Sequence, residues 1–220
     1  LVKGKVKEIR PFIYCVEVDD DYDRAMLFCR YQEFYESPYK KFRGKPFTWM
    51  EYMRHYKDMW KKRTFTYPDD WAGYNIPSNI LDGGVDAFYK ETEYDVIMND
   101  IYYYCAIDSQ NKNNGTRCDW YLIGASSKDK GTMNHEIAHG LYFTNKDYKK
   151  KVNELIGNIK PTHYDKLKKK LIKMGYVNDK KIIDDEIQAF MSTGLYNGLN
   201  TKELKVYEKE FKSNFKKLIK

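Results

Sequence analysis

Apolar residues recur every three or four positions through most of the second half of the chain, which is the period of a helix packed on one side. The pattern predicts helices near residues 146–158, 162–174, 179–193 and 201–219. The last of these has an apolar stripe formed by Leu204, Tyr207, Phe211, Phe215 and Leu218. We therefore expect it to pack against the body of the protein along that stripe.

The first half of the chain mixes strand-like and helix-like segments. Strands are expected over residues 5–18, broken at Pro11, and over 119–125, where aromatic and branched residues concentrate. The other expected segments are helices over 20–36, 48–60 and 85–107, a strand over 102–106, a long irregular loop over 64–84 and a polar turn over 108–115. The pattern predicts an α+β protein that is mostly helical, with a small sheet before a helix over 133–143.

The helix expected over 133–143 contains the sequence His-Glu-Ile-Ala-His at positions 135–139, and Gly131-Thr132 offers its start. Histidines four positions apart lie on one helix face, so both imidazole rings can reach one metal ion. Zinc suits these nitrogens, and Glu136 is placed to take a proton from an attacking water. We predict His135 and His139 as metal ligands and Glu136 as the catalytic base; the alternative is two surface histidines on an amphipathic helix.

A catalytic zinc site needs a third protein ligand besides the two histidines. The metzincin spacing is absent, because Asn145 stands where that pattern has its third histidine. Glu186 is the best candidate, since it falls inside the apolar stripe that Ile183 and Phe190 mark on the helix expected over 179–193. A carboxylate turned towards a core needs a strong partner, and zinc would be one.

Other polar residues around this site have their own expected roles. Asp184 is expected to face solvent, whereas Asp185 could accept a ring N–H from a ligand histidine. His163 and Glu154 stay open as rival third ligands, although each is more typical of a surface position. His55 has no spacing relation to the motif and is expected to be structural.

The order of strand, short loop and His-Glu-x-x-His helix resembles the zincin group of zinc-dependent peptidases. The resemblance implies a catalytic zincin-like domain with zinc as cofactor and a peptide or protein as substrate. It also implies that residues 120–125 pair with an extended substrate, as the strand before the helix commonly does in that group. A glutamate ligand on a later helix is the gluzincin arrangement, but Glu186 lies further from His139 than in its common members.

The sequence leaves other parts of the chemistry open. The donor to the reaction's oxyanion could be Tyr142, Tyr164, Tyr176 or His163. A non-peptide amide is an alternative substrate. The alternative of a different class is a non-catalytic binding or assembly protein that keeps a structural metal.

The length of 220 residues suffices for one zincin-like catalytic domain over 1–220, with a mixed part at 1–126 and a helical part at 127–220 that carries the metal site. Residues 145–220 hold nineteen lysines against ten acidic residues. This basic half is a candidate surface for nucleic acid. Solvated helix faces are the favoured interpretation, because the half has no arginine and no aromatic residues interleave the lysine runs.

The four cysteines, at positions 15, 29, 105 and 118, include no C-x-x-C pair. Reduced thiols in a cytoplasmic protein are therefore expected, with a Cys105–Cys118 bridge as the alternative for a secreted one. No hydrophobic run approaches the length of a membrane span, so no membrane partner is expected. Secretion stays open because the sequence begins without methionine.

Overall fold

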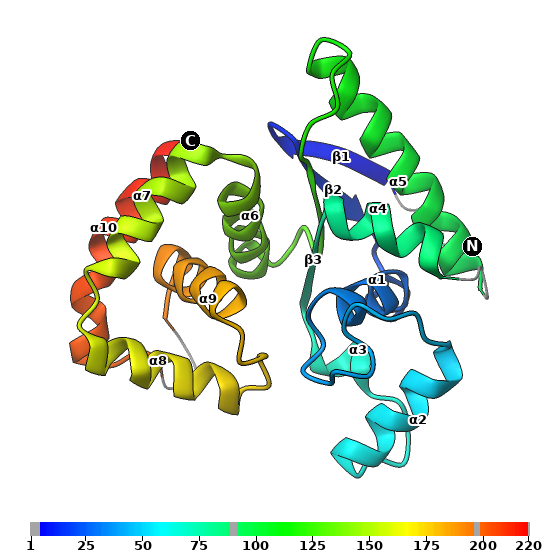
Figure 1. Ribbon diagram of the computed structural model, residues 1–220, viewed down its shortest axis with the longest axis horizontal. Helices are drawn as coiled ribbons and strands as arrows, with labels where there is room; N and C mark the ends of the chain where they lie inside the picture. The colour runs from blue at the N-terminus through cyan, green and yellow to red at the C-terminus, as the bar shows by residue number, and fades with distance from the viewer. Residues whose placement is uncertain (1–4, 89–91, 196–198, 220) are drawn as a thin grey trace.

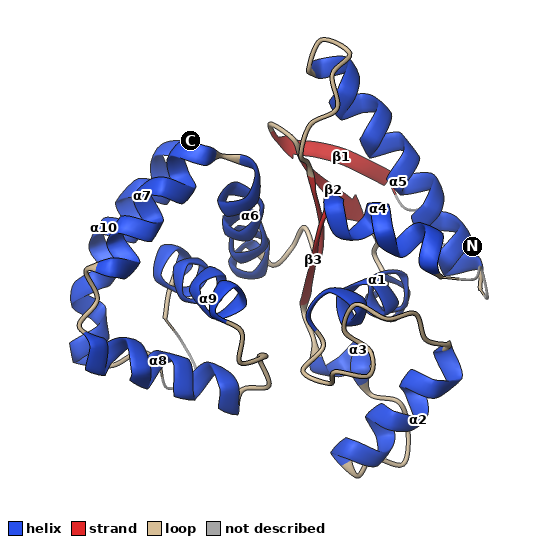
Figure 2. Cartoon of the chain, in the orientation of Figure 1, coloured by secondary structure: helices blue, strands red, loops and turns tan. Residues whose placement is uncertain are grey.

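A computed structural model describes residues 5–88, 92–195 and 199–219. In this part the chain forms one four-stranded sheet and is otherwise mostly helical (Figure 2), which confirms the predicted α+β class. The strands are β1 (Lys5–Arg10), β2 (Ile13–Glu17), β3 (Gly73–Pro77) and β4 (Tyr121–Ala125). The helices are α1 (Asp21–Glu36), α2 (Trp49–Trp60), α3 (Tyr67–Asp70), α4 (Ser78–Ala87), α5 (Glu93–Lys112), α6 (Lys130–Thr144), α7 (Lys146–Gly157), α8 (Pro161–Lys173), α9 (Lys180–Thr193) and α10 (Lys202–Leu218).

The strand order of the sheet is β1-β2-β4-β3, with β2 and β4 parallel and the other two pairs antiparallel. Strand β4 lies between two partners, so that Tyr121 pairs with Ile13 on one side and with Pro77 on the other. An extended ligand can join a sheet only at an unpaired edge. The expectation that residues 120–125 pair with a substrate is therefore wrong, and β3 is the edge strand beside β4.

Both faces of the sheet are buried at β2, β3 and β4, whereas β1 is largely exposed. Alternate residues of β2 and β4 point to opposite faces: Tyr14 and Leu122 join a core with α1 and α5, whereas Ile13 and Ile123 join a second core with α6 and α9. Figure 1 shows helices α1–α5 on one side of the sheet and α6–α10 on the other. The predicted mixed and helical parts of the chain thus occupy opposite faces of one sheet.

Helix starts agree with the sequence pattern in α2 and differ in α6. Helix α2 begins where the helix over 48–60 was expected, and Thr48 and Glu51 form a complete capping box there. Helix α6 begins earlier than Gly131-Thr132 suggested, because the side chain of Asp129 accepts hydrogen bonds from both of those backbone N–H groups. Thr132 is therefore inside the helix.

Four expectations for the first half are wrong, wholly or in part. The loop expected over residues 64–84 contains α3, β3 and the start of α4, and the helix expected over 85–107 is divided between α4 and α5 by a stretch that includes 89–91, outside the described residues. The strand and polar turn expected over 102–106 and 108–115 mostly belong to α5, which runs to Lys112. Its buried residues follow helical spacing, as Met98, Ile101 and Cys105 show, and this packing outweighs the strand propensity of the tyrosines around them.

The four helices expected in the second half are confirmed within one or two residues as α7, α8, α9 and α10. Leu204, Phe211 and Phe215 of the predicted stripe are buried, and α10 packs against α9 and α7. The four cysteines are free, so the alternative Cys105–Cys118 bridge is not formed. Among the described helices, none combines enough length with enough apolar character to cross a bilayer.

Candidate metal centre

Helix α6 carries both motif histidines and is held tightly against the sheet. It packs on β4, β3 and β2. Its Gly140 lies so close to β2 that a Cβ there would be 2.8 Å from Cδ1 of Ile13. Helix α9 packs against α6 (Figure 1), so the side chains of His135 and His139 meet residues of α9.

The donor atoms of His135, His139 and Glu186 converge on one point. The two Nε2 atoms are 3.2 Å apart, and the Glu186 oxygens lie 3.6 Å from His135 Nε2 and 3.5 Å from His139 Nε2. Ligand atoms of a tetrahedral zinc ion, each about 2.0–2.1 Å from the metal, are about 3.3 Å from one another. The structure thus brings the predicted third ligand to the two histidines, with spacings that fit one shared metal ion.

The environment of Glu186 favours a bound cation. Its side chain is buried, with the residue only 3% exposed, and its Oε2 atom has no hydrogen-bond partner. A buried carboxylate oxygen without a partner is costly to the folded state. A metal ion between Glu186 and the two imidazoles would remove that cost.

A second carboxylate fixes the orientation of His139. Its Nδ1 atom is 2.8 Å from Oδ1 of Asp185, so Nδ1 carries a ring proton and Nε2 is the nitrogen that can bind a metal ion. Asp185 is held in turn by Gln188, whose Nε2 donates to the same oxygen at 2.9 Å, and Tyr148 donates to Oε1 of Gln188 at 2.9 Å. Asp185 thus makes the contact expected of it.

The charges of this cluster depend on one another. Burial opposes the charging of His139, but Asp185 and Glu186 raise its pKa well above the usual range. Burial acts to raise the pKa of Glu186, yet His139 and His135 bring it below its usual value. A proton on histidine and a bound metal ion would each stabilise these carboxylates, so protons and metal compete for the site.

Glu136 is buried beside the histidines and against strand β3. It is 4% exposed, and burial raises its pKa although His135 and His139 act to lower it. A Cβ at Gly73 would be only 2.2 Å from Oε1 of Glu136, and Asn75 Nδ2 donates to Oε2 at 2.9 Å. The carboxylate is therefore packed directly on the edge strand.

The edge of β3 is already hydrogen-bonded where it passes the site. The backbone N–H of Asn75 points away from β4 and donates to Oε1 of Gln32 in α1 at 3.0 Å. The same Gln32 donates through its Nε2 to Glu36. A peptide strand added at this edge would have to displace Gln32.

The pattern of the sequence missed three residues around the site, whereas Tyr176 was among the candidate oxyanion donors. Asn75 and Gly73 were placed in a loop, and Glu36 had no spacing relation to the motif. Burial raises the pKa of Glu36 well above its usual value, with Glu186 adding to the effect, and Tyr176 forms a hydrogen bond with Glu186. No local signal marks these residues, because each reaches the site through tertiary packing.

The rival ligands do not join this cluster. His163 Nδ1 is 3.0 Å from the hydroxyl of Tyr207. Glu154 is exposed and pairs with Lys151. His55 packs edge-on against aromatic rings of the N-terminal core, which agrees with the structural role expected for it.

Two of the tyrosines considered as oxyanion donors are bonded elsewhere. Tyr142 donates to Asn153, and Tyr164 donates to Asp184. Asp184 is mostly buried and also pairs with Lys180, so the expectation that it faces solvent is wrong. The reason is that α8 covers this side of α9.

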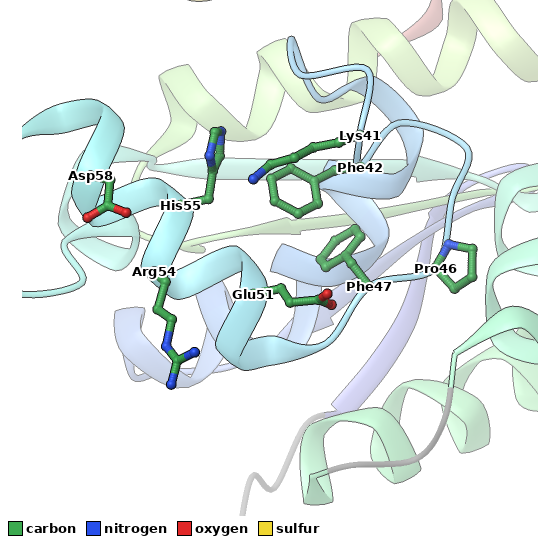
Figure 3. A pocket seen from close by; sticks show the side chains of 8 residues that line it. All are labelled: Lys41, Phe42, Pro46, Phe47, Glu51, Arg54, His55 and Asp58. Atoms are coloured by element: carbon green, nitrogen blue, oxygen red, sulfur yellow. The ribbon is translucent and has the colours of Figure 1, made fainter.

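Two hollows in the described part of the chain lie away from the metal cluster. One, of about 330 Å³, lies beside α2 and is lined by Lys41, Phe42, Pro46, Phe47, Glu51, Arg54, His55 and Asp58 (Figure 3). Figure 3 shows the Lys41 ammonium reaching over Phe42 towards His55, with Arg54 directed away. The other, of about 520 Å³, lies between α7 and α9. Neither hollow is lined by a residue of the metal cluster.

Comparison of the chain with protein-family models, with curated proteins and with solved structures gave no match. The chemistry of the site therefore has to be argued from its own residues.

Proposed function

We propose that the protein is a zinc-dependent hydrolase of the zincin type, a metallopeptidase that cleaves peptide bonds. In this proposal His135, His139 and Glu186 hold the zinc ion, and Glu136 is the catalytic base. The observation that carries the proposal is the convergence of these three donor groups beside Glu136, which is buried on α6 together with the two histidines.

The donor set favours zinc over magnesium and calcium. Two imidazole nitrogens and one carboxylate form a ligand set typical of catalytic zinc, with the fourth position open. Magnesium and calcium prefer sites built from oxygen atoms. Oε2 of Glu186, which has no hydrogen-bond partner, and the two Nε2 atoms that face each other can supply the lone pairs that a zinc ion needs.

When bound, zinc would supply Lewis acidity that lowers the pKa of a water molecule and polarises the substrate carbonyl. Glu136 would accept the proton of the attacking water and then deliver it to the leaving amine. The burial of Glu136 favours this proton transfer, because it raises the pKa of the carboxyl group towards neutral pH. Asp185 would keep the His139 ring in the tautomer that the site needs.

Tyr176 is the tyrosine best placed to act on the substrate. Tyr142 and Tyr164 are engaged with Asn153 and Asp184, whereas Tyr176 hydrogen-bonds with Glu186 at the cluster itself. A phenol at this position could donate to the oxyanion that develops on the carbonyl oxygen. We assign that role to Tyr176 as part of the proposal.

The test combines metal analysis with a hydrolysis assay. Protein purified without added zinc is analysed for metal content and then incubated with a mixture of peptides, whose cleavage is followed by mass spectrometry. We expect about one zinc per chain and cleavage that stops in Glu136→Gln, which should keep its zinc. Zinc binding without cleavage of any peptide would overturn the peptidase assignment, and a fully folded protein that binds no zinc would overturn the metal site.

A further inference from the structure

Three buried side chains form a hydrogen-bonded chain from the sheet to Glu136. The hydroxyl of Tyr121 in β4 donates to Oδ1 of Asn75 in β3 at 2.6 Å. The Nδ2 group of Asn75 then donates to Oε2 of Glu136 in α6 at 2.9 Å. Tyr121, Asn75 and Glu136 are all at least nine-tenths buried, so water does not compete well for these bonds.

The strand register places Asn75 for this contact. Asn75 pairs with Ile123 across β3 and β4, and Tyr121 lies two positions before Ile123 in β4, on the same face of the sheet. Such diagonal neighbours are close enough for a tyrosine to reach across. The Tyr121 hydroxyl occupies Oδ1, which leaves the Nδ2 group of the amide to face Glu136.

The backbone of Asn75 is fixed as well. Its N–H donates to Oε1 of Gln32 in α1, so the residue is held by the sheet on one side and by a helix on the other. Gly73, two positions earlier in β3, gives the Glu136 carboxylate room, because any Cβ there would overlap Oε1. The strand therefore offers the carboxylate one donor and one close-fitting surface.

We propose that Asn75 is a positioning residue for Glu136: its amide occupies one carboxylate oxygen and leaves the other, Oε1, to take the proton of the attacking water. This inference rests on the proposed function of Glu136 as the base. Asn75 contacts none of the three metal ligands through a hydrogen bond in the described structure, so its effect on the metal is indirect.

The chemistry explains why an amide suits this position. A carboxylate accepts hydrogen bonds on both oxygens, and an amide N–H supplies one without adding a charge. The bond therefore satisfies one oxygen of a carboxylate that is buried in the protein. An aspartate at position 75 would instead face Glu136 with a like charge.

The test uses Asn75→Ala and Tyr121→Phe, with Asn153→Ala as a matched control, because Asn153 is an exposed amide that bonds only Tyr142. For each variant we measure zinc content, thermal unfolding and, on a peptide cleaved by the parent, kcat and KM separately. We expect Asn75→Ala to keep its zinc and its KM and to lose about 10–100-fold in kcat. Tyr121→Phe should lose less, since the amide remains but its orientation is no longer fixed.

A second readout does not depend on activity. In protein labelled with ¹³C in the glutamate carboxyl groups, the Glu136 resonance is assigned by its loss in Glu136→Gln and compared among the variants at one pH and one zinc content. We expect its chemical shift to change in Asn75→Ala, to change less in Tyr121→Phe and to stay the same in Asn153→Ala.

The readouts separate this inference from the proposed function. If the parent cleaves no peptide, the proposed function fails, while the Glu136 chemical shift still tests the bond between Asn75 and Glu136. An unchanged Glu136 chemical shift in Asn75→Ala, or a kcat that Asn75→Ala leaves unchanged when the parent is active, would overturn the inference. If Asn75→Ala does not fold, Tyr121→Phe decides by the same two measurements.

Discussion

The ring of His139 on α6 and the carboxylate of Asp185 on α9 are joined by a 2.8 Å contact between Nδ1 and Oδ1. The contact crosses the interface of two helices that are distant in the sequence. It assigns the ring proton to Nδ1 and leaves Nε2 free to bind a metal ion. The same two helices also bring Glu186 to His135, so one packing arrangement forms the whole cluster.

Removing Asp185 should weaken the metal site without destroying it. In Asp185→Ala the His139 ring loses the acceptor that fixes its tautomer, and zinc affinity should fall about 10–100-fold. Competition with a chromogenic chelator measures the change. Asp184→Ala is the matched control, since Asp184 bonds Tyr164 and Lys180 instead and its loss should leave zinc affinity within about threefold. Equal losses in the two variants would contradict the assignment.

The two motif histidines should both be essential for the metal. His135→Ala or His139→Ala leaves only two protein ligands, so we expect zinc below the level of one per chain after dialysis. His163→Ala is the control, because that ring bonds Tyr207 and lies outside the cluster. Elemental analysis gives the result, and retention of stoichiometric zinc by both motif variants would exclude the site.

Glu186 is the assignment that depends most on tertiary structure. Glu186→Gln keeps the size of the side chain but removes the charge that faces the two Nε2 atoms. We expect its zinc affinity to fall at least as far as that of Asp185→Ala, whereas Glu154→Gln, an exposed control, should bind like the parent. A crystal structure with zinc should show a Glu186 oxygen about 2.0–2.2 Å from the metal. Zinc held by another carboxylate would refute the ligand set.

Gly73 should tolerate no side chain, because Glu136 fills the space beside it. A Cβ there would lie 2.2 Å from Oε1 of Glu136 and 2.6 Å from Cγ2 of Thr132. In Gly73→Ala we expect zinc to stay bound while hydrolysis falls at least tenfold. A catalytic group displaced by about 1 Å can lower the rate about 100-fold. Gly83→Ala is the control, since nothing lies within 4 Å of its Cβ position. Normal activity in Gly73→Ala would show that Glu136 can shift without loss.

The elements of the C-terminal half were predictable because their apolar positions follow one helical period. Helical phase also put Glu186 on the inward face of α9, where the structure has it. Periodicity does not identify the element against which that face packs. Only the packing of α9 on α6 decides that Glu186, and neither His163 nor Glu154, meets the histidines.

The N-terminal half was harder to predict, and its errors bear on the site. Strand β3 carries Gly73, Asn75 and Pro77, all poor strand formers, so its propensity favoured a loop. The strand forms because Tyr74 and Ile76 bury their side chains in the core and pair with β4. Because a loop was expected here, the sequence did not identify Asn75, whose role depends on strand register.

A buried acid away from the metal cluster should make folding depend on pH. Glu33 in α1 is 7% exposed, and burial raises its pKa to about 7 despite hydrogen bonds from Ser37, Tyr52 and Tyr67. Its usual pKa is 4.5. Between these two values the folded protein therefore holds a proton on Glu33 that the unfolded chain has released.

The sign of this difference fixes the prediction. A group that binds its proton more tightly in the folded state makes the free energy of unfolding fall as pH rises, here from about pH 4.5 to about pH 7. Glu33→Gln carries no charge and removes that loss. We expect the variant to gain about 1–3 kcal/mol over the parent between pH 4.5 and pH 8.

Urea unfolding of the parent and Glu33→Gln at pH 4.5 and pH 8 measures the effect. A chelator is present throughout, so that pH-dependent zinc binding does not add to the difference. Glu210→Gln is the control, because this glutamate is exposed and its variant should follow the parent at both pH values. A stability difference between Glu33→Gln and the parent that stays the same at both pH values would mean that Glu33 is charged in the folded protein. The hydrogen bonds from Ser37, Tyr52 and Tyr67 would then outweigh its burial.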